Sequence, residues 1–465
     1  MKTKLLFQYY RFLGRCARHY LQKYQIFTIG INGSVGKTSC RMIIHQTLQK
    51  ALPEQRIYTS PKNFNGELWM SLSILQVESR EPQIFTFLKT ALLALKKAFF
   101  SKKNYDIIVL EYGIDRPKEM EFLLTINKPH FWVFTAIDAV HSEQFGNPAE
   151  IAREEVKMVK STREIAFLNA DDAYAQEVMG ALEIDGFSYQ TLGYESRADL
   201  HFSDEKIEIW MQNEHLALTN LKLHLKSQSY SLKTNLLGKP NYGYLSVALV
   251  MAQILVLKIK GEELDMQSFL AEPLIFQLQA GRCSLFKGKE ESILVDSSYN
   301  ASPLSMRKLI DTTLMLNKSL PEQRKVLLVL GDMRELGDLT EKEHRLLAAY
   351  IQQSADFVVL LWTSMHHFLA DELGKIWFPS SQFQLCHSAS EVGKFVLEFL
   401  KKSDEKWILL FKGSQNTIFL EEAVKMLLKK PSDVKFLTRQ SDWWLQKKSD
   451  LFKREESSAF SILCY

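Results

Sequence analysis

Short apolar segments recur along the first half of the chain, and a polar turn and a stretch of helical length follow each of them. The first segment, residues 25–31, leads through a glycine-rich turn into a helix predicted over residues 37–51. Residues 106–111, 131–136 and 165–169 repeat the arrangement. Unbroken apolar strands that alternate with helices are typical of a parallel sheet covered on both faces. This part of the chain is therefore predicted to be an α/β domain.

The pattern changes after residue 199. Residues 199–236 contain alternating stretches such as KIEIWMQ and LKLHLKS, which predict short antiparallel strands. A helix rich in small and apolar residues follows at 243–257. The longest uncharged apolar run in the chain is Tyr244 to Leu257, which is shorter than the ~20 residues that cross a bilayer. We therefore expect a buried core helix here.

A second α/β series begins after a predicted domain boundary at residues 277–281. Its strands are expected at residues 292–298, 325–331, 356–362 and 407–413. The charged tail after Lys430 contains Trp443 and Trp444 and is interpreted as either docked or partly mobile.

Residues 5–24 place apolar side chains at roughly helical spacing, with arginines between them. The apolar positions are Leu5, Leu6, Tyr9, Phe12, Leu13, Cys16, Tyr20 and Tyr24. The pattern predicts an amphipathic helix that either packs against its own domain or contacts a membrane surface or a protein. Because Gln8, Arg11 and Arg15 interrupt the apolar run, no secretory signal is expected.

Composition excludes several classes of function. The net charge of +4 gives no basic field for nucleic acid, so no nucleic-acid partner is expected. The five cysteines are scattered and form no CxxC pair, which argues against a zinc cluster or a disulfide framework. A cytoplasmic protein with reduced thiols is the expectation.

The strongest local motif is GINGSVGKTS at residues 30–39. Backbone N–H groups of such a loop, and the N-terminus of the helix after it, point at phosphate oxygens. Lys37 is expected to neutralise phosphates and Thr38 to ligate Mg²⁺. The commonest nucleotide loop spaces its glycines more widely, and Ile31 stands at the first of those positions. The candidate cofactor-binding residues here are Gly33, Ser34, Val35, Gly36, Lys37, Thr38 and Ser39.

Two further residues stand after predicted strands of the same sheet. Glu111 ends the segment 106–111, and His141 follows the segment 131–136. Each residue by itself is more often structural. Together, at the carboxyl ends of neighbouring strands, they are well placed to hold metal ions.

The order of motifs resembles that of the Mur ligase family. The motifs are GSVGKT, SPKNFNGELWMSLSIL, LEYGIDRPKEM, AIDAVHSEQFGN, FLNADD, LLGKPN, AGR, DSSYNASPLSM, LGDMRELG and FKGS. The likeness runs from about residue 27 to about residue 425 and is greatest to the branch that adds D-alanyl-D-alanine to a UDP-muramoyl tripeptide. It implies an α/β fold with a central parallel-sheet P-loop ATPase domain (27–278) and a smaller Rossmann-like α/β domain (279–430). Residues 1–26 are expected to form an N-terminal amphipathic helix, and residues 431–465 a C-terminal tail.

The resemblance also implies roles for individual residues. Lys37, Glu111, His141 and Glu155 are expected to be catalytic, and Thr38, Glu111, His141 and Glu155 to bind metal. Nucleotide contacts are expected from Asn241, Arg282, Asp296 and Asn300. Substrate contacts are expected from Asn63, Asn65, Lys412 and Ser414.

The chain departs from the family pattern in several places. Only residues 1–26 precede the phosphate-loop strand, so the family's N-terminal UDP-binding domain is expected to be absent. Pro240 and Tyr244 replace a histidine and an asparagine near the adenine position, and Ser297 replaces a second aspartate. In the segment after Asn65, Gly66, Trp69 and Ser71 differ from the usual substrate-contacting pattern.

Many members carry a carbamylated lysine that presents a carboxylate to Mg²⁺. Aligning IAREEVK by its first three letters places Glu155 there, and a shift of two residues selects Lys157 instead. A glutamate would supply the carboxylate without CO₂.

The resemblance implies an ATP- and Mg²⁺-dependent acid–amino-acid ligase of peptidoglycan synthesis that works through an acyl phosphate. Its expected partners are a muramoyl-peptide-like carboxylate and a dipeptide or amino-acid amine, and a monomer is expected. One alternative is a ligase for a different or lipid-linked carboxylate. Another is a nucleotide-dependent switch or assembly protein without ligase chemistry.

Overall fold

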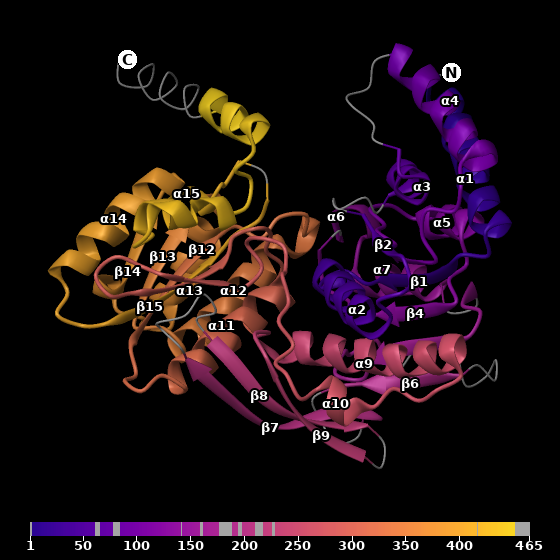
Figure 1. The fold of residues 1–465 in the computed structure, drawn as a ribbon. Coiled ribbons are helices and arrows are strands. Elements are labelled where there is room, and N and C mark those ends of the chain that lie inside the picture. Colours follow the sequence, from indigo (N-terminus) through magenta and orange to yellow (C-terminus); the bar gives the residue numbers. More distant parts are fainter. Residues whose placement is uncertain are drawn as a thin grey trace. The chain divides into compact units, whose positions relative to one another are not determined.

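The chain forms two compact units in a computed structural model (Figure 1). Unit 1 comprises residues 1–206 and 219–277, and unit 2 comprises residues 207–218 and 278–465. The structure describes residues 2–60, 66–77, 84–140, 142–158, 161–175, 188–193, 198–209, 217–225, 228–415 and 417–451. Residues 207–218, predicted from the sequence to lie in the central domain, group with unit 2.

The first sheet has nine strands within the described residues, in the order β2-β3-β1-β4-β5-β6-β7-β8-β9. The strands are β1 (Phe27–Asn32), β2 (Ile57–Thr59), β3 (Ile107–Glu111), β4 (Phe131–Phe134), β5 (Ile165–Asn169), β6 (Tyr189–Leu192), β7 (Leu200–Ile209), β8 (Ala217–Leu225) and β9 (Gln228–Thr234). Strand β1 pairs in parallel with β3 and β4. Strands β8 and β9 are antiparallel, as the alternating pattern predicts.

Helices cover the sheet of unit 1, which is why its central strands are mostly apolar. The helices are α1 (Lys2–Lys23), α2 (Lys37–Ala51), α3 (Glu67–Leu75), α4 (Ile84–Phe100), α5 (Glu119–Ile126), α6 (Ser142–Phe145), α7 (Pro148–Val156), α9 (Lys239–Lys260) and α10 (Met266–Phe269). Leu13 and Ala17 of α1 share a buried cluster with Leu110 of β3 and Trp132 of β4. Helix α1 therefore packs against its own unit.

Helix α9 is the one described helix that is long and apolar enough to cross a membrane. Of its apolar window, 72% is buried within the structure. It packs along α2, and Leu245, Ala248 and Leu249 are fully buried. The prediction of a core helix is confirmed.

Unit 2 is built on a sheet of six described strands in the order β10-β11-β15-β12-β13-β14. They are β10 (Ser284–Lys287), β11 (Ile293–Ser297), β12 (Lys325–Gly331), β13 (Phe357–Leu361), β14 (Phe383–Cys386) and β15 (Trp407–Lys412). Only the β10–β11 pair is antiparallel among these pairings. The α/β class with two parallel-sheet units is therefore confirmed.

The helices of unit 2 follow its strands along the chain. They are α11 (Pro303–Lys318), α12 (Thr340–Gln352), α13 (Ala370–Lys375), α14 (Ala389–Lys402) and α15 (Glu421–Leu427), with the short 3-10 helices η2 (Gly337–Leu339), η4 (Ser380–Gln382) and η5 (Pro431–Phe436) and the π-helix η3 (Met365–Leu369). Residues 442–451 are helical. Leu437, Arg439 and Lys448 are buried, so the described part of the tail is docked on unit 2.

Candidate active site

The phosphate loop joins β1 to α2 through two glycines in the left-handed region. Gly33 has φ +116° and Gly36 has φ +87°, a conformation that side chains disfavour. A Cβ at Gly33 would overlap the Thr135 hydroxyl, and a Cβ at Gly36 would overlap the Tyr244 hydroxyl. The Ser34 N–H donates to the Ala136 carbonyl at 2.7 Å. These contacts require glycine at both positions and fix the path of the loop.

The loop's side chains are held close to its backbone. The Lys37 ammonium donates to the Gly33 carbonyl and, at 3.3 Å, to the Ser34 carbonyl. The Thr135 hydroxyl lies 2.6 Å from the Val35 carbonyl. The Ser34 hydroxyl is buried and has no hydrogen-bond partner among the described residues. An orphaned hydroxyl inside a phosphate-type loop has the chemistry to bind an anion's oxygen.

Glu111 lies at the carboxyl end of β3, directly beside β1 in register with Ile31. Its carboxylate accepts from the Thr38 hydroxyl at 3.3 Å and from the Arg41 Nε at 2.6 Å. The three residues are buried. The structure therefore brings Thr38 and Glu111 together at the carboxyl edge of the sheet, as their sequence positions predict.

Arg41 is a member of this group that the sequence prediction missed. It stands four residues after Lys37, one turn along α2, and the turn spacing was the available signal. Its guanidinium also donates to the Thr59 hydroxyl at 2.7 Å and to the Ser60 carbonyl. Arg41 therefore ties the Glu111 carboxylate to the segment after β2.

The two candidates for a carboxylate at the C-terminal end of α7 have different partners. Glu155 is buried, and its Oε2 accepts from the Asn32 side-chain amide at 2.7 Å. Asn32 ends β1 and in turn accepts from the Trp132 indole N–H at 2.5 Å. Lys157 instead donates to Glu121 at 2.7 Å and to Glu154 at 2.9 Å, in a partly exposed group. Glu155 is thus the α7 residue that reaches the base of the phosphate loop.

Three predicted residues, His141, Asn63 and Asn65, lie outside the described residues. Ile137, four residues before His141, donates its N–H to the Asp172 carboxylate at 2.9 Å, and burial raises the pKa of the Asp172 carboxyl. Within the described ranges, no group of three or more His, Cys, Asp or Glu side chains could hold a metal ion.

Asn241 and Pro240 both lie in the first turn of α9. The Asn241 amide donates to the Leu237 carbonyl at 2.8 Å. Tyr244, one turn further along α9, brings its hydroxyl against Gly36. The helix that carries the predicted adenine-side residue therefore also touches the phosphate loop.

Three motifs of unit 2 that are distant in sequence meet at the carboxyl ends of β11, β15 and β12. The Lys412 ammonium donates to the Asn300 carbonyl at 2.9 Å, and the Ser414 hydroxyl donates to the Ala301 carbonyl at 3.2 Å. The Ser414 N–H donates to the Asp332 carbonyl at 3.1 Å. Lys412, Ser414, Asn300 and their neighbours thus form one cluster.

Asp296 lies at the end of β11, fully buried. Its Oδ1 accepts from the Ser298 N–H at 3.0 Å, while its Oδ2 has no hydrogen-bond partner among the described residues. Burial raises the pKa of the Asp296 carboxyl to about 6.

Arg282, another predicted nucleotide-side residue of this unit, lies over the Tyr299 ring. The distance from its guanidinium carbon to the ring centroid is 4.5 Å.

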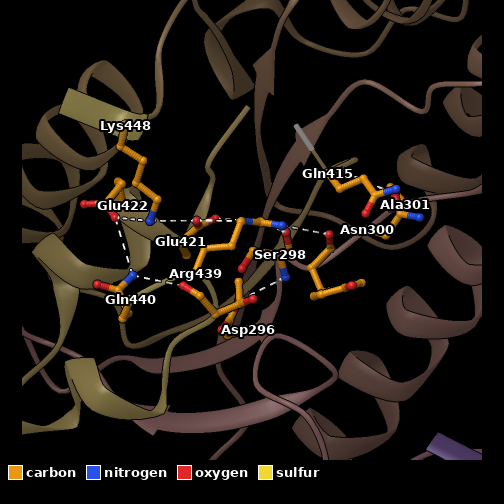
Figure 2. Close-up of polar contacts among 12 residues, drawn as sticks. Asp296, Ser298, Asn300, Ala301, Gln415, Glu421, Glu422, Arg439, Gln440 and Lys448 are labelled. Carbon is orange, nitrogen blue, oxygen red and sulfur yellow. Dashed lines mark hydrogen bonds and ion pairs between the residues drawn. The ribbon is translucent and has the colours of Figure 1, made fainter. Parts of the chain in front are cut away.

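A buried ion network connects the tail to the loop that follows Asp296 (Figure 2). Arg439 donates to the Glu421 carboxylate at 2.8 and 2.7 Å and to the Ser298 and Tyr299 carbonyls at 2.8 and 3.2 Å. Lys448 pairs with the same Glu421 carboxylate at 2.8 Å. No motif indicated this network, because isolated charges in a charged tail usually point to solvent.

Two comparisons by sequence place these sites among known domains. Residues 31–252 match the Mur ligase middle domain, and residues 281–415 match the Mur ligase glutamate ligase domain. The UDP-N-acetylmuramoyl-tripeptide–D-alanyl-D-alanine ligase of Bacillus subtilis (strain 168) is 24% identical over 421 residues, which are 90% of this chain and 79% of the relative.

Solved structures share the fold. MurF from Acinetobacter baumannii has a TM-score of 0.67 at 20% identity and covers 90% of this chain and 80% of its own. MurF ligase from Thermotoga maritima, solved in complex with ADP, has a TM-score of 0.65 at 20% identity and covers 90% of this chain and 83% of its own. Because the two domain matches together span most of the chain in the order expected, the protein belongs to the Mur ligase family.

Proposed function

We propose that this protein is an ATP-dependent ligase that activates a carboxylate as an acyl phosphate and joins it to an amine. The reaction we assign is addition of D-alanyl-D-alanine to a muramoyl tripeptide in peptidoglycan synthesis, in the cytoplasm. The name of the Bacillus subtilis relative, which aligns with 90% of this chain, supports the substrates. The family of both matched domains supports the reaction class.

The arrangement of three groups in unit 1 supports this proposal. The phosphate loop, the Thr38 hydroxyl and the Glu111 carboxylate converge at the carboxyl end of β1 and β3, with 3.3 Å between the Thr38 and Glu111 oxygens. In open α/β sheets, ligands bind at this edge. The Ser34 hydroxyl of the loop, which has no hydrogen-bond partner among the described residues, adds a further donor.

The Thr38 and Glu111 oxygens fit Mg²⁺. Mg²⁺ prefers oxygen ligands at about 2.1 Å in octahedral geometry, so adjacent ligand oxygens stand about 3 Å apart. The observed 3.3 Å separation is close to that edge. When bound, Mg²⁺ neutralises phosphate charge. Arg41 holds the Glu111 carboxylate in position through its 2.6 Å contact.

In the proposed reaction, the protein's contribution is to position and neutralise the transferred phosphoryl group. We assign Lys37 and the loop N–H groups to the phosphate oxygens of ATP, and Glu155 to the support of this site through Asn32. The cluster of Asp296, Asn300, Lys412 and Ser414 is assigned to nucleotide and substrate contacts on unit 2. The incoming amine attacks the acyl phosphate carbon, and inorganic phosphate leaves.

The test is an assay of ADP release from ATP in the presence of UDP-muramoyl tripeptide, run once with D-alanyl-D-alanine and once without it. A ligase releases ADP only when both the carboxylate and the amine are present. Parallel assays with lipid-linked muramoyl tripeptide decide which form of the carboxylate is used. ADP release that ignores both substrates would reject the ligase assignment in favour of a nucleotide-dependent switch.

A further inference from the structure

Helices α1 and α4 lie side by side at one edge of unit 1 (Figure 1). Tyr9 near the start of α1 donates to the Phe87 carbonyl at 3.1 Å. At the other end, the His19 ring stacks on Phe99 with centroids 4.3 Å apart, and Lys23 donates to the Phe99 carbonyl at 2.8 Å. The two helices therefore run parallel and are held at both ends.

The side chains of α4 are distributed in the reverse of the usual order for a surface helix. Its buried positions are the small residues Thr90, Ala94 and Ala98, spaced four apart toward the interior. Leu88 is 64% exposed and Leu92 is 59% exposed. A helix that buries alanine and exposes leucine gains little by packing on its own domain.

Exposed apolar side chains are concentrated on these two helices. Eight of the 17 large apolar side chains that are exposed among the described residues belong to them: Leu5, Leu6, Phe7, Leu88, Leu92, Leu93, Phe99 and Phe100. We call this group the α1–α4 surface. Single exposed apolar residues are ordinary, whereas a concentration of them on two neighbouring helices indicates a surface that contacts something apolar.

The charges on the same helices indicate the chemistry of the partner. The sequences of α1 and α4 contain nine lysines and arginines and no aspartate or glutamate. The whole chain has 58 basic and 54 acidic residues, so the remainder has 49 basic and 54 acidic residues and is net negative. Arg11, Arg15 and Arg18 of α1 and Lys89 and Lys96 of α4 are exposed.

We propose that the α1–α4 surface binds the protein to an anionic lipid surface, with the leucine and phenylalanine side chains in the interfacial region and the basic side chains at the headgroups. Apolar residues interleaved with Lys and Arg are the pattern of helices that lie on membranes. Because all the charged residues of α1 and α4 are basic, a second copy of these helices would bring like charges together across the interface. An anionic bilayer satisfies both the apolar and the basic side chains.

The experiment is flotation of the full chain with vesicles of phosphatidylcholine alone and of phosphatidylcholine with phosphatidylglycerol. We expect binding to the phosphatidylglycerol vesicles that weakens as salt rises. Leu88→Glu with Leu92→Glu should lower the bound-to-free ratio by at least about tenfold, since two apolar insertions are lost. Lys89→Glu with Lys96→Glu should also lower it. ADP release without vesicles should match the parent for both variants.

Matched controls come from unit 2. Leu346→Glu changes a leucine that is 53% exposed, and Lys394→Glu with Lys402→Glu reverses two exposed lysines. Both controls should float like the parent. The proposal is overturned if the parent binds neither vesicle type, or if the α4 variants float as well as the controls. It is also overturned if the parent forms a dimer in solution that the Leu88 and Leu92 changes abolish, because the surface would then join two copies.

Discussion

Lys37 is the residue on which the nucleotide assignment depends most directly. Lys37→Ala removes a charge that contacts only loop carbonyls in the described contacts, so the fold should be retained. We expect turnover to fall by about 10²-fold or more, since a preorganised charge at the transferring phosphate is lost. ADP release with both substrates measures the loss. Lys50→Ala, at the far end of the same helix, should be near normal, and a fully active Lys37→Ala enzyme would remove the phosphate-loop assignment.

Glu155 distinguishes two ways of supplying a carboxylate near the phosphate loop. Glu155→Gln keeps an oxygen for the 2.7 Å contact from Asn32 but loses the charge. We expect a strong loss of turnover and no dependence of the parent on bicarbonate. Lys157→Ala should be almost as active as the parent, because Lys157 pairs with Glu121 and Glu154 instead. The opposite result, a bicarbonate-dependent parent and an inactive Lys157→Ala variant, would select the lysine.

The buried Asp296 carboxyl gives the stability of unit 2 a specific pH dependence. Burial raises its pKa from 3.8 to about 6, so the folded state retains the proton while the unfolded chain releases it. This residue therefore lowers the free energy of unfolding as pH rises from about 4 to about 6, by about 3 kcal/mol in total. Below about pH 4 Asp296 causes no such loss of stability, and above about pH 6 the full loss is present.

Denaturant titrations of the parent and of Asp296→Asn between pH 4 and pH 7 isolate this effect. The stability of the variant relative to the parent should rise through that window. Asp404→Asn, at an exposed position, should show no such trend. A parent–variant difference that is flat with pH would mean that Asp296 titrates normally.

At the scale of elements, the tail acts as a support for the nucleotide-side loop of unit 2. Arg439→Ala leaves the Glu421 carboxylate with Lys448 but removes two hydrogen bonds to the loop carbonyls at Ser298 and Tyr299. Breaking a buried ion pair from one side costs about 3–5 kcal/mol. The denaturation midpoint of unit 2 should fall accordingly. Lys430→Ala, an exposed change just before η5, is the control, and an unchanged midpoint in Arg439→Ala would show that the network adds no net stability.

The elements that the sequence predicted correctly share one physical property. Strands β1, β3, β4, β12 and β15 are buried on both faces, so most of their residues are apolar and their polar residues stand mainly at the strand ends. Strands β10 and β14 were missed because they lie at the two edges of their sheet, where half-buried side chains give no continuous run. Helix α4 was also missed, and its pattern is unusual because Leu88 and Leu92 are exposed while the smaller Ala94 and Ala98 face the core.

Some residues of the candidate site could be predicted from the sequence, and others could not. The phosphate loop and the motifs of unit 2 are local in sequence, so their spacing alone predicts their chemistry. Arg41 and Arg439 act on carboxylates 70 and 18 residues away. A single sequence does not specify such pairings, because many arginines are equally placed along the chain. The structure was required to select these two.

At the scale of the whole molecule, each unit has its own buried cluster, and the nine-stranded sheet belongs to unit 1 except for the end of β7 and the start of β8, which group with unit 2. Two such units are expected to unfold in separable steps. A nonhydrolysable ATP analogue with Mg²⁺ should raise the unfolding temperature of the step that belongs to unit 1, and Lys37→Ala should remove the shift. Calorimetry measures both steps. A shift that persists in Lys37→Ala would place nucleotide binding elsewhere.

The buried network of the tail also has a consequence for the order in which the protein forms on the ribosome. Chains lengthen by about 5–20 residues per second, and domains tend to fold as they emerge. The sheet of unit 2 is complete in sequence at Lys412, but Glu421 gains its cations only when Arg439 and Lys448 have been made. Until then, closing the core around Glu421 would bury an unpaired charge. Unit 2 is therefore expected to reach its native state only after the tail emerges, later than the position of its last strand suggests.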